Sequence, residues 1–289
     1  MADAPAGISV LVPFRDSADY FERCIRAVLT QDIPPDRYEV ILIDNGSSDG
    51  SRTLAGRFSK VRIVTEPKAG AYAARNRGVA EARGEILVFT DADCAPEPGW
   101  LRLLSQSIAE PGVEVVLGSR RPARNSAGLR LMMLYEETKA ATIFSEADPS
   151  LYYGYTNNMA VRKRTLVDFG GFREVMRGAD SVFVRQLVER RGCGAVRYCV
   201  NAAVTHLEIT SLRRIYGKHL TYGRSNQWNS RSVMTCQPMS LRKRWQTYRA
   251  TVRKHSLGAA DAGLLLGVLV CGGIGYEVGR LGGRFGAGG

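Results

Sequence analysis

Residues 86–93 read I-L-V-F-T-D-A-D, and this stretch decides the fold. The first five residues form a short apolar run that predicts a buried strand, and two carboxylates follow it at once. In open α/β sheets, ligands bind beyond the carboxyl ends of the strands. Asp91 and Asp93 therefore predict a ligand site at one edge of a sheet.

Strand and helix patterns alternate on the N-terminal side of this stretch. Such alternation predicts an α/β fold with a mostly parallel sheet flanked by helices. Polar clusters follow the first two strands, at Arg15-Asp16 and from Asp44 to Asp49, and we expect them to converge with Asp91 and Asp93. The strands are expected at 8–12, 39–43 and 61–64, and the helices at 20–29 and 71–83.

The second half of the chain is less regular. A Gly-Gly-Phe turn at 170–172 precedes a helix, and a strand ends at His206. Asn157 and Asn158 fit either the acceptor side of a site or a turn. We expect one domain at 1–206 and a basic helical segment at 207–289. Helices are expected at 100–108, 129–141 and 181–190, and a strand at 196–205.

The charge is concentrated near the C-terminal end. The net charge is +12, yet residues 205–289 hold 13 Lys and Arg against 3 Asp and Glu, while 1–204 hold 27 against 25. A basic segment indicates an anionic partner, which includes lipid head groups, nucleic acid or phosphorylated glycan. A solvated charged face is the simpler alternative. The 45% hydrophobic content is ordinary for a globular protein.

An apolar run follows the basic residues. Residues 262–276 hold no charge, and extending the run back to Leu257 includes Asp261. A spanning helix needs about 20 apolar residues, so 257–276 fits a span, a shallow re-entrant segment or a buried helix. Trp245 and Tyr248 lie just upstream and fit an aromatic belt at the cytoplasmic side of a membrane.

Several protein classes lack their signature here. No G-x-G-x-x-G follows the first strand, and no P-loop pattern is present, which disfavours a nucleotide-dependent dehydrogenase and a P-loop enzyme. The six cysteines form no C-x-x-C pair, and their scatter suits a reducing compartment. The first strand begins at Ile8, so we expect no secretory signal peptide. No recognised nucleic-acid motif is present, and we expect no nucleic-acid partner.

Six motifs occur in order and carry a family resemblance. They are V-P-F-R-D at 12–16, I-D-N-G-S-S-D-G-S at 43–51, A-G-A-Y-A-A-R-N-R-G at 69–78, F-T-D-A-D at 89–93, G-G-F-R-E at 170–174 and G-A-D at 178–180. At these motifs the sequence resembles the family 2 glycosyltransferases, which have the GT-A fold. The resemblance covers about residues 7–206. It implies an inverting, membrane-associated enzyme that uses a nucleotide-sugar donor, UDP-sugar being favoured, with Mn²⁺ or Mg²⁺.

The resemblance also implies roles for particular residues. Asp180 matches the general base, which takes the proton of the acceptor hydroxyl. The metal ligands would be Asp91, Asp93 and His206, with Asp93 the more direct one. Ala179 stands where the family often has Glu, and Cys94 where a third Asp is common. The nucleotide-binding residues would be Pro13, Arg15, Asp44, Asn45, Gly70, Arg75 and Asp91.

Structural roles are open for several of these residues. Asp180 follows Gly178 at the start of an expected helix and suits an N-cap as well as a base. His206 suits a structural histidine, and Arg15 and Arg75 suit surface charges. Asp44 suits a turn former.

The expected function is transfer of one sugar to a hydroxyl of a lipid-linked or cell-surface glycan, in cell-surface polysaccharide biosynthesis. We expect the cytoplasmic face of an anionic membrane as the location. A processive polysaccharide synthase is one alternative, but Arg244-Trp245 lacks the Gln of a Q-x-x-R-W motif. A non-catalytic nucleotide-sugar-binding protein is the other.

Overall fold

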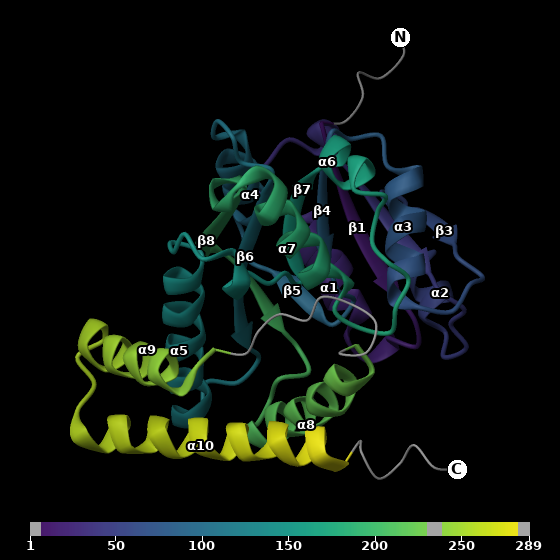
Figure 1. Cartoon of the computed structure of the whole chain (residues 1–289). Coiled ribbons are helices and arrows are strands. Elements are labelled where there is room, and N and C mark those ends of the chain that lie inside the picture. The colour runs from purple at the N-terminus through teal and green to yellow at the C-terminus, as the bar shows by residue number, and fades with distance from the viewer. Residues whose placement is uncertain (1–6, 230–238, 283–289) are drawn as a thin grey trace. The chain divides into compact units, whose positions relative to one another are not determined.

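The chain forms two compact units. A computed structural model describes residues 7–229 and 239–282. Unit 1 comprises residues 1–121 and 152–207, and unit 2 comprises residues 122–151 and 208–289. Figure 1 shows the elements of both units.

Unit 1 is built on an eight-stranded sheet with the order β3-β2-β1-β4-β7-β6-β8-β5. The strands β3, β2, β1 and β4 are parallel, whereas β7 is antiparallel to both β4 and β6, and β5 is antiparallel to β8. The α/β class is confirmed, and the sheet is mixed because the second half of the chain returns by antiparallel strands. The strands are β1 Ile8–Phe14, β2 Tyr38–Asp44, β3 Arg62–Thr65, β4 Ile86–Thr90, β5 Cys94–Pro96, β6 Val115–Pro122, β7 Asn158–Arg162 and β8 Val196–His206.

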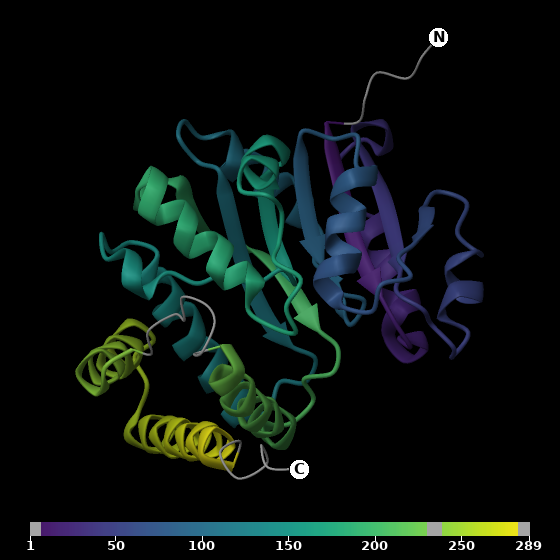
Figure 2. The ribbon, with the colours of Figure 1, turned by 45° about the vertical axis from the view of Figure 1, so that its right-hand side comes forward.

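Helices cover both faces of this sheet (Figure 2). On one face, α1 and α4 pack in a core that includes the fully buried Phe21 and Trp100. On the other face, Phe172 joins Phe89 of β4 to Phe183 of α7, at ring distances of 5.4 and 5.7 Å. The helices of unit 1 are α1 Ala18–Leu29, α2 Ser51–Ala55, α3 Ala71–Glu81, α4 Trp100–Ala109, α6 Lys163–Asp168 and α7 Ala179–Arg191.

Unit 2 is helical. Leu131 and Tyr135 of α5 form a small buried core with Leu265 of α10. Although α5 lies within the range 1–206, it groups with the C-terminal helices. In the part of the chain that the structure describes, α10 is the one helix long and apolar enough to span a membrane, with a mean hydropathy of 1.6 over Ala259–Leu281. The helices are α5 Ala127–Ile143, α8 Leu212–Asn229, α9 Leu241–Lys254 and α10 Ala259–Gly282.

Candidate active site

Asp44 lies at the end of β2 as a fixed carboxylate. Its Oδ1 accepts a hydrogen bond from the backbone N–H of Ser47 at 3.0 Å, and its Oδ2 accepts one from Arg52 Nη1 at 3.0 Å. Burial opposes the ionised form, but the donors of Ser47 and Arg52 outweigh it and hold the pKa of Asp44 below its ordinary value. Asp44 is therefore a buried anion at the edge of the sheet.

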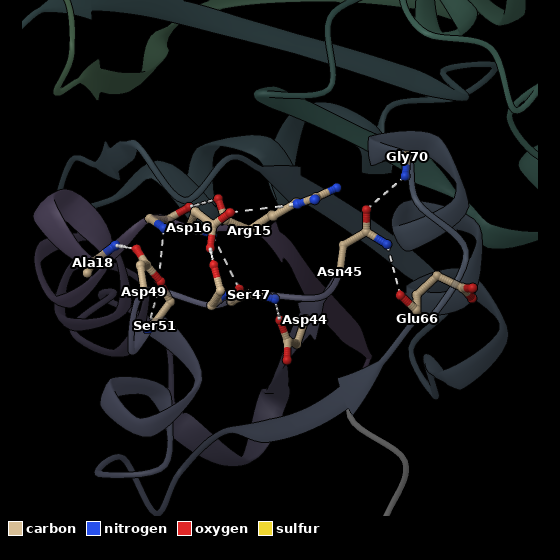
Figure 3. Close-up of polar contacts among 12 residues, drawn as sticks. Arg15, Asp16, Ala18, Asp44, Asn45, Ser47, Asp49, Ser51, Glu66 and Gly70 are labelled. Atoms are coloured by element: carbon tan, nitrogen blue, oxygen red, sulfur yellow. Dashed lines mark hydrogen bonds and ion pairs between the residues drawn. The ribbon is translucent and has the colours of Figure 1, made fainter.

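The loop after β1 is fastened to the loop after β2 (Figure 3). Asp16 Oδ1 accepts a hydrogen bond from the backbone N–H of Ser48 at 2.7 Å, and Asp49 Oδ2 accepts one from the N–H of Ala18 at 2.9 Å. Asp16 has a φ of 47°, in the left-handed region. These bonds hold the two loops in one arrangement, since each carboxylate bridges from one loop to the other.

Asn45 fastens the next loop in turn. Its Nδ2 donates to the backbone carbonyls of Glu66 at 2.9 Å and Lys68 at 2.8 Å, and its Oδ1 accepts from the N–H of Gly70 at 2.8 Å. Figure 3 shows Asn45 reaching across to Glu66 and Gly70. Both amide hydrogens are thus used within the protein, so the Asn45 side chain positions the chain that leads into α3.

Arg75 of α3 is buried and bound to Asp91. Its Nη2 lies 2.6 Å from Asp91 Oδ1, and its guanidinium carbon lies 5.2 Å from the ring centroid of Tyr72. Burial disfavours the charge of Arg75, but the carboxylates of Asp91 and Asp180 outweigh this and raise the pKa of Arg75. Among the described residues, Arg75 Nε has no hydrogen-bond partner. Arg75 is therefore a fixed cation and not a surface charge.

Asp180 is the second residue of α7 and is held by the chain before β7. Its Oδ2 accepts a hydrogen bond from the backbone N–H of Thr156 at 3.1 Å, and its Oδ1 accepts one from the N–H of Ser181 at 2.9 Å. The residue that precedes the helix is Gly178, with a φ of 85°. The alternative role of Asp180 as the N-cap is therefore wrong, because the helix begins one residue earlier.

Tyr72 brings the start of α7 to α3. Its hydroxyl oxygen accepts a hydrogen bond from the N–H of Gly178 at 3.1 Å. Burial raises the pKa of Tyr72, and the nearby carboxylate of Asp180 raises it further. Asp180 and Asp91, which are far apart in the sequence, thus both lie close to Tyr72 and Arg75.

The Gly-Gly-Phe turn is placed by Asn76 of α3. Asn76 Nδ2 donates to the carbonyl of Phe172 at 2.8 Å, and its Oδ1 accepts from the N–H of Phe172 at 3.0 Å. This reciprocal pair holds the turn against α3, and the segment from the turn leads directly to Asp180.

Asp93 and His206 meet through strand pairing. Cys94 of β5 lies opposite His206 of β8 in the antiparallel register, and the N–H of Leu207 donates to the carbonyl of Asp93 at 2.7 Å. This pairing brings Asp93 Oδ2 to 3.3 Å from His206 Nδ1. A carboxylate and an imidazole so placed fit two ligands of one divalent cation such as Mn²⁺.

Cys94 lies beside this pair. The candidate ligand atoms of Asp93, Cys94 and His206 all lie within 4.8 Å of one another. Cys94 is fully buried, and its Sγ lies 3.5 Å from Asp93 Oδ1. Burial and the carboxylates of Asp93 and Asp91 raise the pKa of the Cys94 thiol. Of these three groups, the carboxylate is the donor type best suited to Mn²⁺, and the thiol is the softest.

The other residues predicted to bind the nucleotide lie close to the ends of β1 and β2 or at the start of α3. Pro13 pairs with Ile43 within the sheet, and the Arg15 side chain is 57% exposed, with its Nε 3.7 Å from Asp16. Gly70 precedes α3 with a φ of 139°, which favours glycine. Pro13, Arg15 and Gly70 thus all border the polar edge where β1 and β2 end.

Asn158 is a structural residue. It is fully buried on β7, where its Nδ2 donates to the carbonyls of Ser119 at 2.6 Å and Ala202 at 2.9 Å. Its Oδ1 accepts from Trp100 Nε1 at 2.8 Å. Both suggested roles for Asn158, on the acceptor side or in a turn, are wrong, because its amide ties three elements together inside the core.

Three contributors were missed by the sequence reasoning. Arg52 and Thr156 donate to Asp44 and Asp180, and no local signal identifies either one. Tyr72 had a signal, because it stands three residues before Arg75 on the same face of a helix.

Known proteins resemble this chain in sequence. Glycosyl transferase family 2 matches residues 9–181. Glycosyltransferase AglE of Haloferax volcanii is 37% identical over 117 residues, which are 39% of this chain and 38% of AglE. The pre-mycofactocin glycosyltransferase of Mycobacterium tuberculosis is 27% identical over 229 residues, which are 75% of this chain and 46% of that protein. The chain thus spans less than half the length of these relatives.

Solved structures share the fold. The mannosyltransferase PcManGT from Pyrobaculum calidifontis, in complex with GDP-Man and Mn²⁺, has a TM-score of 0.63 at 19% identity, covering 96% of this chain and 83% of that one. S. aureus TarS 1–349 in complex with UDP has a TM-score of 0.55 at 16% identity, covering 96% and 91%. At these identities the likeness concerns the fold. The match over residues 9–181, more than half of the chain, shows that the chain belongs to glycosyl transferase family 2.

Proposed function

We propose that this protein transfers one sugar from a nucleotide-diphosphate sugar to an acceptor hydroxyl, with a divalent metal and with inversion at the sugar carbon. The observation that carries the proposal is the meeting of Asp180 and Asp91 around Arg75 and Tyr72. In this arrangement Asp180, the candidate general base, lies near Arg75 and Asp91, which match the motif that contacts the diphosphate. Family membership and fold neighbours in complex with GDP-Man or UDP support the donor class.

Asp44 suits recognition of the base of the nucleotide. Each carboxylate oxygen of Asp44 accepts one hydrogen bond within the protein and keeps further acceptor capacity. The lowered pKa keeps it ionised near neutral pH, so it could accept an N–H of a base such as uracil or guanine. The resemblance to family 2 glycosyltransferases makes UDP-sugar the favoured donor.

Asp93 and His206 suit Mn²⁺ or Mg²⁺, and Asp91 stands two residues before Asp93 in the sequence. A divalent cation held there would neutralise the diphosphate and stabilise the charge that develops on it. Arg75, which is always protonated, offsets the negative charge of Asp91 next to this site. The buried Arg75 Nε adds a donor that is without a partner among the described residues.

Asp180 suits the role of general base. The acceptor oxygen forms a bond to the anomeric carbon while the bond from that carbon to the diphosphate oxygen breaks. The acceptor proton passes to the Asp180 carboxylate, which Thr156 and Ser181 hold in place. An in-line attack of this kind inverts the sugar carbon.

The acceptor is proposed to be a lipid-linked or cell-surface glycan at the cytoplasmic face of the membrane, in cell-surface polysaccharide biosynthesis. The concentration of basic residues in 205–289 and the apolar helix α10 support a location at an anionic membrane. We further propose that 1–206 is the transfer domain and that 207–289 makes the membrane contact.

The test is a donor panel with and without Mn²⁺. Thermal unfolding is followed with UDP-, GDP- and other nucleotide sugars, because a ligand at 100 times its Kd stabilises the folded state by about 2.7 kcal/mol. Metal-dependent stabilisation by one donor, followed by sugar transfer in a membrane extract, is expected. Binding without transfer would favour the non-catalytic alternative, and long products would favour the processive synthase. No stabilisation by any donor would contradict the proposal.

A further inference from the structure

One face of helix α10 is buried and the opposite face is exposed. Leu265 and Val268 are buried against other helices of unit 2. The opposite face carries aliphatic side chains that are 39–58% exposed and recur every three or four residues. We call these residues the apolar row: Leu266, Val270, Ile274, Val278 and Leu281.

The buried face of α10 is fastened closely to α8. Tyr216 donates to the carbonyl of Val268 at 3.2 Å, and His219 Nδ1 lies 3.2 Å from the carbonyl oxygen of Gly272. A Cβ atom at Gly279 would lie 2.2 Å from the carbonyl oxygen of Leu220, so only glycine permits this approach. The row therefore belongs to a helix that is packed along much of its length.

The partner helix α8 is unsuited to a membrane interior. It carries Arg213, Arg214 and Lys218, and the two arginines are exposed. If α10 crossed the bilayer, it would either lose its contacts with α8 or draw these cations into the hydrocarbon, which is costly. A helix lying along the surface keeps both the contacts and the hydration of the cations.

Cations lie on α9, the helix that precedes α10 and packs against its first turn. Helix α9 contains six Lys and Arg and no acidic residue. Arg253 and Lys254 are exposed and stand shortly before α10, and Tyr248 joins α9 to α10 by donating to the carbonyl of Ala262 at 3.0 Å. Trp245, 51% exposed, stacks on Tyr248 at 5.0 Å. This combination of cations, an exposed aromatic ring and an aliphatic row is complementary to an anionic lipid surface.

Within the residues that the structure describes, the row is exposed. Figures 1 and 2 show α5, α8 and α9 on the same side of α10. On the row side, Glu277 is the one charged residue among the exposed positions of α10, and it is paired with Arg280 at 2.7 Å. The exposed side of α10 thus offers aliphatic surface with little charge.

We propose that unit 2 binds an anionic lipid bilayer with α10 lying in the plane of the membrane surface. The apolar row enters the head-group boundary, and the cations of α9 bind the lipid phosphates. The inference rests on the proposed membrane location of the acceptor and specifies how the protein reaches it. It replaces a membrane-spanning role for 257–276 with a surface role.

The first test measures binding of the full chain to sealed vesicles by flotation, without donor or metal. Binding to vesicles of phosphatidylcholine and phosphatidylglycerol is expected, with at least a tenfold loss for the V270D/I274D variant and a marked loss in high salt. V200D, which alters an exposed valine of β8, is the matched control and is expected to bind normally. Equal binding of V270D/I274D and the wild type would overturn the proposal. A wild type that does not float but forms a dimer through the row would also overturn it.

The second test distinguishes a surface helix from a span. A C-terminal epitope tag is added to the full chain, and protease is applied to inside-out membrane vesicles and to spheroplasts. Cleavage in the inside-out vesicles and protection in spheroplasts are expected, since both ends of α10 would lie on the cytoplasmic side. The reverse pattern would establish a span and overturn the proposal. Neither test uses turnover, so a failure here is distinct from a failure of the transfer reaction.

Discussion

Cys94 and His206 lie opposite each other on the antiparallel strands β5 and β8, and this register sets Asp93 Oδ2 at 3.3 Å from His206 Nδ1. The two residues of the candidate metal site are more than 100 positions apart in the chain. Their proximity depends on the pairing of a three-residue strand with the end of a long one.

Replacing His206 with Ala is expected to weaken Mn²⁺ binding at least about tenfold, since one nitrogen ligand is lost while Asp93 remains. Calorimetric titration of Mn²⁺ in the presence of nucleotide measures the effect. His255→Ala, at the residue that follows α9, is the control and is expected to leave affinity unchanged. An equal Mn²⁺ affinity of the two variants would show that His206 is not a metal ligand.

Replacing Asp180 with Asn is expected to lower kcat by about 10²–10⁴, the usual contribution of a general base. The amide oxygen can still accept the hydrogen bond from Thr156, whereas the bond from Ser181 is lost. Donor affinity is expected to remain near that of the wild type, with a loss of stability of about 1 kcal/mol. Single-turnover kinetics and donor titration check the two quantities. E189Q, which alters an exposed residue of the same helix, is the control. Near-normal turnover of D180N would show that another group accepts the proton.

Replacing Arg75 with Ala is expected to destabilise the fold by about 1.5–3 kcal/mol, because a charge-assisted hydrogen bond to Asp91 is lost. Weaker donor binding is expected as well. Arg77→Ala is the matched control, since its partially exposed pair with Glu81 is worth at most about 0.5 kcal/mol. Urea unfolding and donor titration measure both effects. Equal stability of the two variants would show that the Arg75–Asp91 pair contributes little.

Replacing Asp44 with Asn is expected to destabilise the protein at pH 7, and the difference from the wild type should shrink in acid. The folded pKa of Asp44 is lowered, so its ionisation stabilises the fold above the unfolded pKa of about 3.9. This contribution is lost as the pH falls through the lower folded pKa. Denaturant unfolding of both proteins between pH 7 and pH 3 measures it. A difference that grows in acid would contradict the assignment.

Local patterns predicted much of unit 1. The strands at 8–12, 39–43 and 86–90 form with ends shifted by at most two residues, because their short apolar runs fit buried positions between two helical layers. The helices at 71–83 and 129–141 also form, as Ala71–Glu81 and Ala127–Ile143. The periodicity of apolar residues shows which face of a strand or helix is buried. This is enough to locate these strands and helices along the sequence.

Pairing between distant segments was not predicted. The strands β5, β6 and β7 carry little periodicity, and their antiparallel arrangement makes the sheet mixed. The same pairing places Asn158 in the core, although its sequence context fits either the acceptor side of a site or a turn. A local pattern holds no information about which partner a strand selects, since that choice depends on packing over the whole unit.

The sequence by itself determined the α/β class, the carboxylates that follow the strands and the resemblance to family 2 glycosyltransferases. Only the tertiary structure decided that His206 meets Asp93, that Asp180 lies near Arg75 and Tyr72, and that α10 is packed along α8. The physical reason is that side-chain type and spacing specify local structure, whereas these meetings arise from strand register and helix packing between residues far apart in the chain.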